Sequence, residues 1–329
     1  MAMRLALTGT GKIVEELLPH LRDWGWEAAA LCATPRSLEK GRALAARNGG
    51  FPVYDDYGAM LAETAANAVY LGVPNALHAP LAHQALAAGW NVIVEKPLTG
   101  SLREAEALAH LAKQEGRFLY EAITTLHQPD YAALKAQLPR VGPIRLVSCQ
   151  YSQYSSRYDA FRAGETPPAF DPLHAGGALM DLNLYNLHWL LGLFGPPLQV
   201  RYDANLERGI DTSGVVHLVY PAFQAVSIAA KDCRAPGRYL IQGTEGYLLQ
   251  ETPANVCGAV TLHLNDGREE RFHTPTEHRM EAEFRHFARQ LQAGDLASCY
   301  ALLEQSLQVS AVLTAARRDA GIHFPGDEA

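Results

Sequence analysis

The sequence predicts an α/β fold over its N-terminal part, a doubly wound parallel sheet, followed by an α+β domain with a large, mostly antiparallel sheet. Up to residue 122, short apolar strands alternate with helical segments; from residue 144 on, strand-like runs follow one another without helices between them. Helices between strands imply parallel right-handed crossovers, whereas strands joined by short turns pair antiparallel. We therefore assign residues 1–122 to a first domain and residues 123–329 to a second.

The chain begins with a strand, a glycine turn and a helix. Residues 4–8 form a short apolar strand, Gly9-Thr10-Gly11 a turn, and residues 12–22 a helix with apolar positions on one side. Gly9 permits the tight turn, and Gly11 lets the backbone approach a pyrophosphate that the helix start binds. Val14 stands where a G-x-G-x-x-G pattern has its third glycine, so the strand–turn–helix placement carries the prediction of a dinucleotide site.

The end of the second strand, predicted over residues 28–33, bears on the choice between NAD and NADP. An NAD site usually places a carboxylate about 20 residues past the glycines. Here Thr34 and Arg36 occupy that region, and the first carboxylate is Glu39. A hydroxyl and a guanidinium suit a 2′-phosphate, which favours NADP and leaves NAD possible. In the alternative interpretation, Arg36 only begins a solvated helix.

Further strands are predicted at residues 67–73, 91–95 and 116–122, with helices over 79–88 and 102–114. The strand from Asn91 ends in Glu95-Lys96-Pro97, at the edge where open α/β sheets bind ligands. Proline blocks further pairing and allows a cis Lys96–Pro97 bond, so the lysine is expected to be held rigidly. The alternative is an ordinary strand end with a solvated lysine.

The second domain has strands and turns in succession. We predict strands at 144–153, 214–220, 225–231, 238–242, 247–250 and 260–264, hairpin turns at 243–246 and 265–267, and helices at 131–138, 277–292 and 300–318.

A nearly apolar helix predicted over residues 178–191 carries Asp181, Tyr185 and His188 at i, i+4 and i+7, on one face. A carboxylate in an apolar helix costs several kcal/mol unless it is paired. We expect Lys96 to be that partner across the interdomain cleft. The alternative is that Asp181 caps the helix or ties down a loop. We interpret His188 as a core residue and leave it out of the catalytic set.

Several motifs together resemble one family. They are Gly9-Thr10-Gly11-Lys12-Ile13, Pro35-Arg36, Gly72-Val73-Pro74-Asn75 with His78, Glu95-Lys96-Pro97, Tyr120-Glu121-Ala122, and the run from Gly176 to Tyr185. In this order they resemble the glucose-fructose oxidoreductase/inositol dehydrogenase/rhizopine-catabolism (Gfo/Idh/MocA) family over nearly the whole chain. Val14 and Asn183 depart from the pattern. Tyr185, where inositol-dehydrogenase-like members have histidine, resembles the dihydrodiol dehydrogenase branch.

The resemblance implies an NAD(P)-dependent dehydrogenase or reductase acting on sugars, polyols, diols or their keto forms, and a second-domain sheet whose free face makes a homodimer or a dimer of dimers. It implies a cofactor site at Gly9, Thr10, Gly11, Lys12, Ile13, Thr34, Arg36, Pro74, Asn75, His78, Glu95, Lys96 and Pro97, and catalysis by Lys96, Asp181 and Tyr185. Two alternatives stay open within the family: a catalytically silent NADP-binding regulator and an NAD-dependent glycosidase.

Hydride transfer to a carbonyl builds negative charge on its oxygen, which an acid must stabilise and protonate. Lys96 or Tyr185 carries that proton, and the sequence does not decide between them; Asp181 orients both. A polar and aromatic loop follows residue 153, and its Arg157 and Tyr158, with His174 and Asn183 further along, are candidate substrate contacts. A solvated surface loop is the alternative. His174 and His188 make no zinc pattern, so we expect no metal.

Composition agrees with this interpretation. The net charge of -7 and a pI near 6.0 argue against nucleic acid and anionic membrane surfaces as partners. The five cysteines are scattered without a C-x-x-C pair, and no apolar run is long enough to span a membrane. We therefore expect a cytoplasmic protein with a small-molecule substrate.

Overall fold

The computed structural model describes residues 2–325 and 327, and the chain divides into two units. Unit 1 comprises Met1–Ala122 together with Glu283–Glu304, and unit 2 comprises Ile123–Ala282 with Gln305–Ala329. The first division thus follows Ala122, where the sequence places a domain boundary. The second domain, expected to run from 123 to 329, differs from the structure because Glu283–Glu304 returns to unit 1.

Unit 1 is built on a six-stranded sheet of order β3-β2-β1-β4-β5-β6, in which every pair is parallel. This confirms the predicted doubly wound sheet. The order reverses between β1 and β4, and ligands of such sheets bind outside the carboxyl ends of the strands at that point. The strands are β1 Met3–Thr8, β2 Trp26–Cys32, β3 Val53–Tyr54, β4 Ala68–Leu71, β5 Asn91–Glu95 and β6 Leu119–Ala122.

The helices of this first segment are α1 Lys12–Leu17, α2 Leu38–Arg47, α3 Tyr57–Glu63, α4 His78–Ala87 and α5 Leu102–Gln114. Helix α5 has the predicted bounds. Helix α1 is shorter than predicted and continues as a 3₁₀ turn over Leu18–His20, because Pro19 has no N–H to extend the α-helical ladder. Strand β3 escaped prediction since two residues carry no periodicity.

Aromatic packing explains why α9, Glu281–Ala293, belongs mainly to unit 1. Phe284 is fully buried, with ring centroids 6.0 Å from Trp24 and 5.7 Å from Tyr70. Its carbonyl accepts a hydrogen bond of 2.9 Å from the indole N–H of Trp26. One turn later, the ring of Phe287 stacks on Tyr120 at 4.3 Å. Sequence periodicity shows that a helix is amphipathic but not which surface covers its apolar face.

Unit 2 contains an eight-stranded sheet of order β14-β13-β12-β11-β7-β10-β9-β8. Only β7 and β10 pair in parallel among its seven neighbouring pairs, which confirms the mostly antiparallel prediction. The strands are β7 Ile144–Ser152, β8 Gln199–Glu207, β9 Ile210–Val219, β10 Gln224–Ala230, β11 Arg238–Gly243, β12 Gly246–Gln250, β13 Val260–Leu264 and β14 Glu269–Phe272.

The two strands that sequence analysis missed, β8 and β14, are the two edges of this sheet. Both are rich in polar and charged side chains, as edge strands often are. Edge strands bury little, so they lack the apolar alternation by which strands are recognised.

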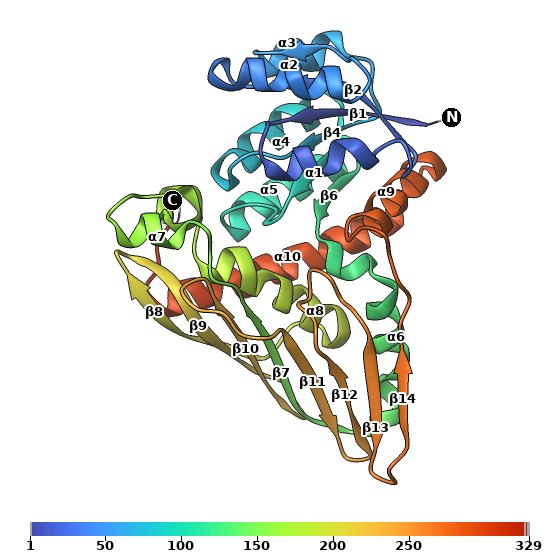
Figure 1. Cartoon of the computed structure of the whole chain (residues 1–329), viewed down its shortest axis with the longest axis vertical. Helices are drawn as coiled ribbons and strands as arrows, with labels where there is room; N and C mark the ends of the chain where they lie inside the picture. Colours follow the sequence, from blue (N-terminus) through green and yellow to red (C-terminus); the bar gives the residue numbers. More distant parts are fainter. Residues whose placement is uncertain (1, 326, 328–329) are drawn as a thin grey trace. The chain divides into compact units, whose positions relative to one another are not determined.

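Helices pack on the sheet of unit 2 from one side: α6 Pro129–Gln137 contacts β13 and β14, and α8 Leu184–Phe194 contacts β7 and β10 (Figure 1). The short α7 is Tyr158–Arg162, and the last helix, α10 Leu296–Asp319, divides between the units after Glu304. The helix predicted over 178–191 differs from the structure, which has a π-helical segment at Leu179–Asn183 before α8. The apolar sequence gives no sign of that change.

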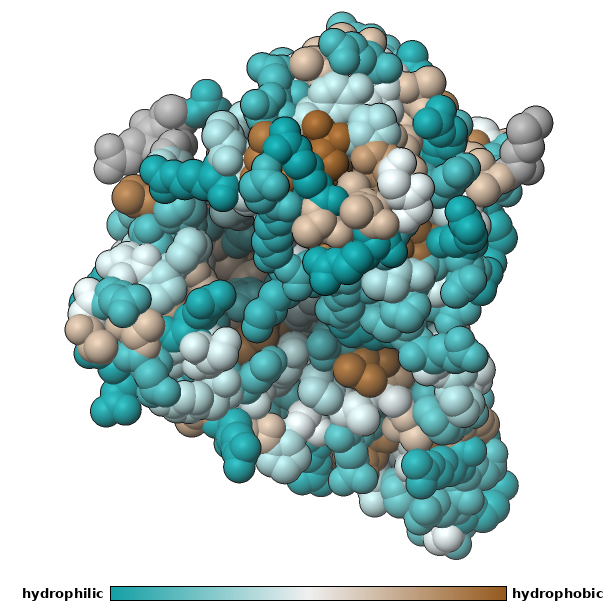
Figure 2. Space-filling model, turned by 45° about the horizontal axis from the view of Figure 1, so that its top comes forward, coloured by the Kyte–Doolittle hydropathy of each residue, from teal (hydrophilic) through white to brown (hydrophobic). Residues whose placement is uncertain are grey.

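Figure 2 shows a face on which hydrophilic residues predominate and hydrophobic ones are scattered, as is usual for folded chains. In the described part of the chain, no helix is both long enough and apolar enough to cross a membrane.

We expect Phe284→Ala to lower the free energy of unfolding of unit 1 by about 3–5 kcal/mol, because it opens a cavity among buried rings. Chemical denaturation followed by tryptophan fluorescence measures this, since Trp24 and Trp26 contact Phe284. The exposed Arg289 of the same helix gives the control: Arg289→Ala should change the value by less than about 0.5 kcal/mol. Similar values for both variants would contradict the role assigned to this ring.

Candidate functional site

Unit 1 has a cavity of about 610 Å³ beside the carboxyl ends of β1, β2 and β4. Of the predicted cofactor residues, Gly9, Thr10, Gly11, Thr34 and Pro74 line it. The other lining residues are Thr8, Cys32, Ala33, Pro35, Ser37, Asp55, Tyr57, Gly72, Val73, Leu77 and Leu81. The cavity therefore lies at the switch point of the sheet, where the sequence predicts the dinucleotide.

The glycine turn is fixed by the neighbouring strands. The N–H of Gly9 donates to the carbonyl of Cys32 and the N–H of Gly72 to that of Thr8, each at 2.9 Å. Gly9 has a φ of +101°, and a Cβ there would lie 2.3 Å from the carbonyl oxygen of Gly72. Only glycine fits both the angle and the space. The turn keeps the backbone bare where a pyrophosphate must approach, so these residues fit a dinucleotide.

Val14, which replaces the third glycine of the pattern, is accommodated from the opposite side. It is fully buried, and a Cβ on Gly72 would come within 2.7 Å of its Cγ2. Gly72 at the end of β4 thus provides the room that the helix residue does not. The departure at Val14 from the glycine pattern is compensated by this glycine.

The end of β2 carries a small hydroxyl cluster. Thr34 Oγ1 and Ser37 Oγ lie 2.9 Å apart, on a 3₁₀ turn over Pro35–Ser37 whose Arg36 is exposed. A carboxylate, Asp55, also lines the cavity, from the loop after β3. Asp55 follows a strand of two residues, and neither was predicted from the sequence.

The apolar wall of the cavity was missed as well. Leu77 and Leu81 line it one helical turn apart, and the hydroxyl of Tyr57 donates to the carbonyl of Leu81 at 3.2 Å. The i, i+4 spacing of the leucines after Pro74-Asn75 was the available signal.

His78, predicted to bind the cofactor, is fully buried. Its Nδ1 lies 2.7 Å from the carbonyl oxygen of Pro97 and its Nε2 lies 3.0 Å from that of Val73. Burial lowers the pKa of His78, and the two carbonyls oppose this. The imidazole therefore ties the turn after β4 to the turn after β5. It holds together two turns that carry other residues of the predicted site.

The turn that presents Lys96 is held by carboxylates on both sides. Glu95 Oε1 accepts from the hydroxyl of Tyr70 at 2.5 Å, and Glu95 Oε2 accepts from the N–H of Lys96 at 3.3 Å. Glu121 Oε1 accepts from the N–H of Leu98 at 2.9 Å. The Lys96–Pro97 bond is cis, as the sequence allowed.

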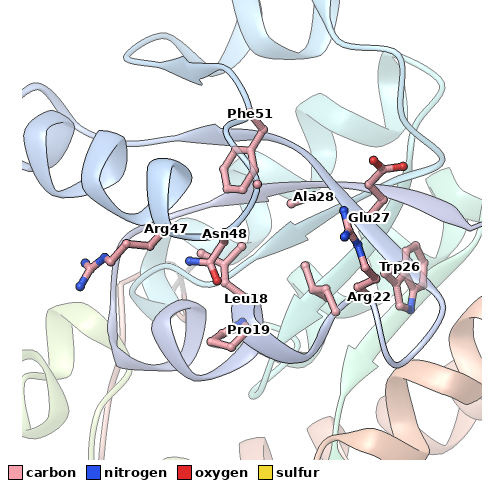
Figure 3. Close-up of a pocket in the computed structure, with 11 residues that line it drawn as sticks. Leu18, Pro19, Arg22, Trp26, Glu27, Ala28, Arg47, Asn48 and Phe51 are labelled. Carbon is pink, nitrogen blue, oxygen red and sulfur yellow. The ribbon is translucent and has the colours of Figure 1, made fainter.

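A second cavity of unit 1, of about 260 Å³, lies at the opposite, amino ends of the strands, around the start of β2 and the loop before β3 (Figure 3). In Figure 3 the guanidinium groups of Arg22 and Arg47 lie far apart on either side of Asn48. The cavity lies away from the switch point of the sheet, so we assign it no part in the site.

In unit 2, Asp181 projects from the π-helical segment with its side chain 37% exposed. Its Oδ2 accepts a hydrogen bond of 2.7 Å from Lys231 Nζ, whose side chain is only 2% exposed. The sequence led us to expect Lys96 as partner. We missed Lys231, which follows β10, because a lysine at a strand end is ordinarily solvated.

Tyr185 is almost buried, and its ring lies 5.9 Å from that of Tyr151. His188 is fully buried within α8, in agreement with the interpretation as a core residue. Asn183, expected to line the substrate site, is also fully buried; its amide donates to the carbonyl of Ser227 at 3.2 Å. The structure therefore places Asn183 between helix and sheet, and it has no open surface to offer a substrate.

The candidate substrate loop folds into α7 and two 3₁₀ turns, Pro168–Phe170 and Pro172–His174. Arg157 is exposed, and the hydroxyl of Tyr158 donates to Glu207 at 3.3 Å. The ring of Tyr158 packs 5.7 Å from that of Phe170. His174 Nδ1 lies 2.8 Å from Asp171 Oδ2. The loop is thus more ordered than a solvated segment.

Known proteins resemble this chain along its length. The model of the oxidoreductase family with an NAD-binding Rossmann fold matches residues 3–122, and that of the GFO/IDH/MocA C-terminal domain matches residues 137–249. The scyllo-inositol 2-dehydrogenase (NADP(+)) IolU of Bacillus subtilis is 33% identical over 99% of this chain and 100% of its own. A trans-1,2-dihydrobenzene-1,2-diol dehydrogenase of Danio rerio is 26% identical over 99% of each chain.

Among solved structures, a 3-ketoreductase from Actinomadura kijaniata in complex with NADP and TDP-benzene superimposes with a TM-score of 0.85, at 25% identity, over 97% of this chain and 98% of that one. The fold, the glycine turn and these matches agree with one another and confirm the resemblance of the motifs. The chain belongs to the GFO/IDH/MocA family of oxidoreductases.

Proposed function

We propose that the protein is a dehydrogenase or reductase that moves a hydride between a nicotinamide dinucleotide and a CH–OH or C=O carbon of a sugar, polyol or diol. The glycine turn and its cavity at the switch point of the Rossmann sheet carry the cofactor part of this proposal. The substrate class is supported by the Bacillus subtilis and Danio rerio relatives, which are named for an inositol and a dihydrobenzene diol.

Lys96, Asp181 and Tyr185 are the proposed catalytic residues. The bound nicotinamide supplies or accepts the hydride. Lys96 donates a hydrogen bond to the substrate oxygen and stabilises the negative charge that develops on it. Tyr185 or Lys96 transfers the proton, and Asp181 holds the donor in place by its charge. The rigid turn around Lys96 supports this role, because a preorganised donor needs no reorganisation during the reaction.

NADP is the proposed cofactor. Thr34, Arg36 and Ser37 stand together at the end of β2, where hydroxyls and a guanidinium suit a 2′-phosphate. The name of the Bacillus subtilis relative specifies NADP(+), and the Actinomadura enzyme was solved with NADP. NAD is the alternative.

We further propose that the outer face of the unit 2 sheet joins two copies in a homodimer, or in a dimer of dimers. Large apolar side chains open to solvent stand on this face: Leu146 is 51% exposed and Tyr247 38% exposed. Leu240 on β11 and Leu249 on β12 are half-buried and lie opposite each other. A sheet covered on one face only leaves such residues for a partner.

The cytoplasm is the proposed location, since four of the five free cysteines are buried thiols.

The central test is a spectrophotometric screen of sugars, polyols and diols with both nicotinamide cofactors. On the substrate found, Lys96→Met should lower turnover by about a hundredfold or more, the usual scale for losing such a donor, with little change in NADP affinity. Near-normal turnover of this variant would show that the turn only seats the cofactor.

Tyr185→Phe removes a single hydroxyl and accompanies that test. If the hydroxyl carries the proton, the variant should lose turnover, and its pH profile should lack the limb set by the ionisation of that hydroxyl.

The same screen separates the alternative functions. A silent regulator would show no turnover with any substrate, and a glycosidase would bind cofactor without net consumption.

Arg36→Ala should weaken NADP binding roughly ten- to a hundredfold and leave NAD binding nearly unchanged, because the guanidinium is expected to contact only the 2′-phosphate. Fluorescence titration with each cofactor measures both affinities. Arg42, exposed on α2 and paired with Glu39, gives the control variant Arg42→Ala. Equal losses for the two cofactors would assign Arg36 a structural role.

Leu146→Asp combined with Leu240→Asp should convert the dimer to monomers, because it buries carboxylates in the proposed interface. Light scattering at micromolar concentration measures the mass. Leu173 is 66% exposed on a loop outside the sheet, and Leu173→Asp should leave the mass unchanged. A wild-type monomer, or a dimer that persists in the double variant, would refute this interface.

A further inference from the structure

We propose that Lys231 is a positioning residue of the reaction, which holds the Asp181 carboxylate in place from within unit 2. This inference rests on the proposed catalytic role of Asp181. It adds a residue that lies outside the motifs of the sequence and was not among its candidate site residues.

The contact between the two side chains is direct and asymmetric. Lys231 Nζ lies 2.7 Å from Asp181 Oδ2, with the lysine side chain 2% exposed and the aspartate 37% exposed. The ammonium group is thus on the protein side and the carboxylate faces outward. Such an arrangement fixes the direction of the carboxylate.

Lys231 is anchored independently of Asp181. Its backbone N–H donates to the carbonyl of Thr212 at 2.7 Å, which extends the pairing of β10 with β9. Its Nζ also donates to the carbonyl of Ala169 at 2.8 Å and lies 4.7 Å from the centroid of the Phe170 ring. A buried ammonium is tolerated when it has such partners. The lysine therefore serves as a fixed point to which Asp181 is tied.

Two other carboxylates face the same region. Asp211 on β9 is fully buried, and burial raises its pKa; it accepts from the hydroxyl of Tyr202 at 2.7 Å and from the N–H of Leu179 at 2.6 Å. Asp232 accepts from the hydroxyls of Thr212 and Ser213, each at 2.8 Å.

These contacts give the three carboxylates different roles. Asp211 holds the start of the segment that carries Asp181, and Asp232 is bound by hydroxyls. Asp181 receives the ammonium hydrogen bond itself. Lys231 thus gives its hydrogen bond to the carboxylate that we place in the catalytic set, while its charge also acts on Asp211, where it lowers the pKa against the larger effect of burial.

A purely structural brace is the competing interpretation, since Lys231 also holds the turn at Ala169 and Phe170. The two interpretations differ in pH dependence. An opposite charge within about 4–6 Å lowers the pKa of an aspartate by about 1–3 units, so its removal has the reverse effect. Activity that needs the ionised carboxylate is present above that pKa and lost below it. Removing Lys231 should then move the acid limb of the pH profile to higher pH.

The test uses Lys231→Met in the full-length enzyme on the substrate found by the screen. We expect turnover to fall at least about tenfold at neutral pH, and the acid limb of kcat to rise by about one unit or more, with NADP affinity unchanged. Lys231→Arg keeps the charge and should keep the wild-type acid limb, although the planar guanidinium cannot reproduce the contacts of the ammonium and should lower turnover.

Arg208→Met is the matched control. Arg208 braces the same loop region: it donates to the carbonyl of Glu165 at 3.0 Å and lies 3.6 Å over the ring of Phe161. These contacts are with Phe161 and Glu165 of the loop, so Arg208→Met should leave the acid limb in place. In an Asp181→Asn background, Lys231→Met should add little further loss if it acts through that carboxylate.

The outcomes separate the inference from the proposed function. If Asp181→Asn keeps full turnover, the proposed catalytic set is wrong. If Asp181→Asn is impaired but Lys231→Met leaves the acid limb unmoved, or adds its full effect to Asp181→Asn, Lys231 is only a brace and the inference is overturned. Should Lys231→Met fail to fold, Lys231→Arg decides: a loss of turnover that disappears in the Asp181→Asn background supports the inference, and unchanged turnover or an additive loss refutes it.

Discussion

The close approach of Gly9 to the carbonyl of Gly72 is the constraint on which the cofactor cavity depends. Backbone hydrogen bonds tie the ends of β1, β2 and β4 together, and the turn that leaves β1 has no room for a side chain. The same Gly72 gives space to Val14 on its other side. Two glycines, each directly after one of two neighbouring strands, thus set how near the backbone, the first helix and a pyrophosphate can come to one another.

The sequence predicted those parts of the fold that repeat or that bury apolar side chains. Helix α5 and the strands from β10 to β13 lie where periodicity and turn residues placed them. Strands β3, β8 and β14 were missed because they are either very short or polar edges. The π-helical segment was missed because its composition is that of an α-helix. The packing of α9 on unit 1 was missed because an amphipathic pattern does not show which surface covers the apolar face.

The candidate site was predictable where chemistry requires a residue type and not where geometry selects it. The glycine turn and Lys96 stand out because few other residues fit a tight turn or a strand end followed by proline. Asp55 and Leu81 reach the cavity only through the path of the chain. His78 is buried between two carbonyl oxygens, and sequence cannot distinguish an imidazole that touches a ligand from one that supports the surrounding loops. Lys231 shows the converse, a buried charge that resembles a surface residue in the sequence.

The division of unit 1 into two stretches of the chain also governs the order in which it can be completed during synthesis. The strands of its sheet emerge from the ribosome first, but the helix that covers Trp24, Tyr70 and Tyr120 is translated only after the whole large sheet of unit 2. Until then, α9 cannot pack on these rings. The nascent first unit therefore waits, with an aromatic surface open, for nearly the entire chain to be made.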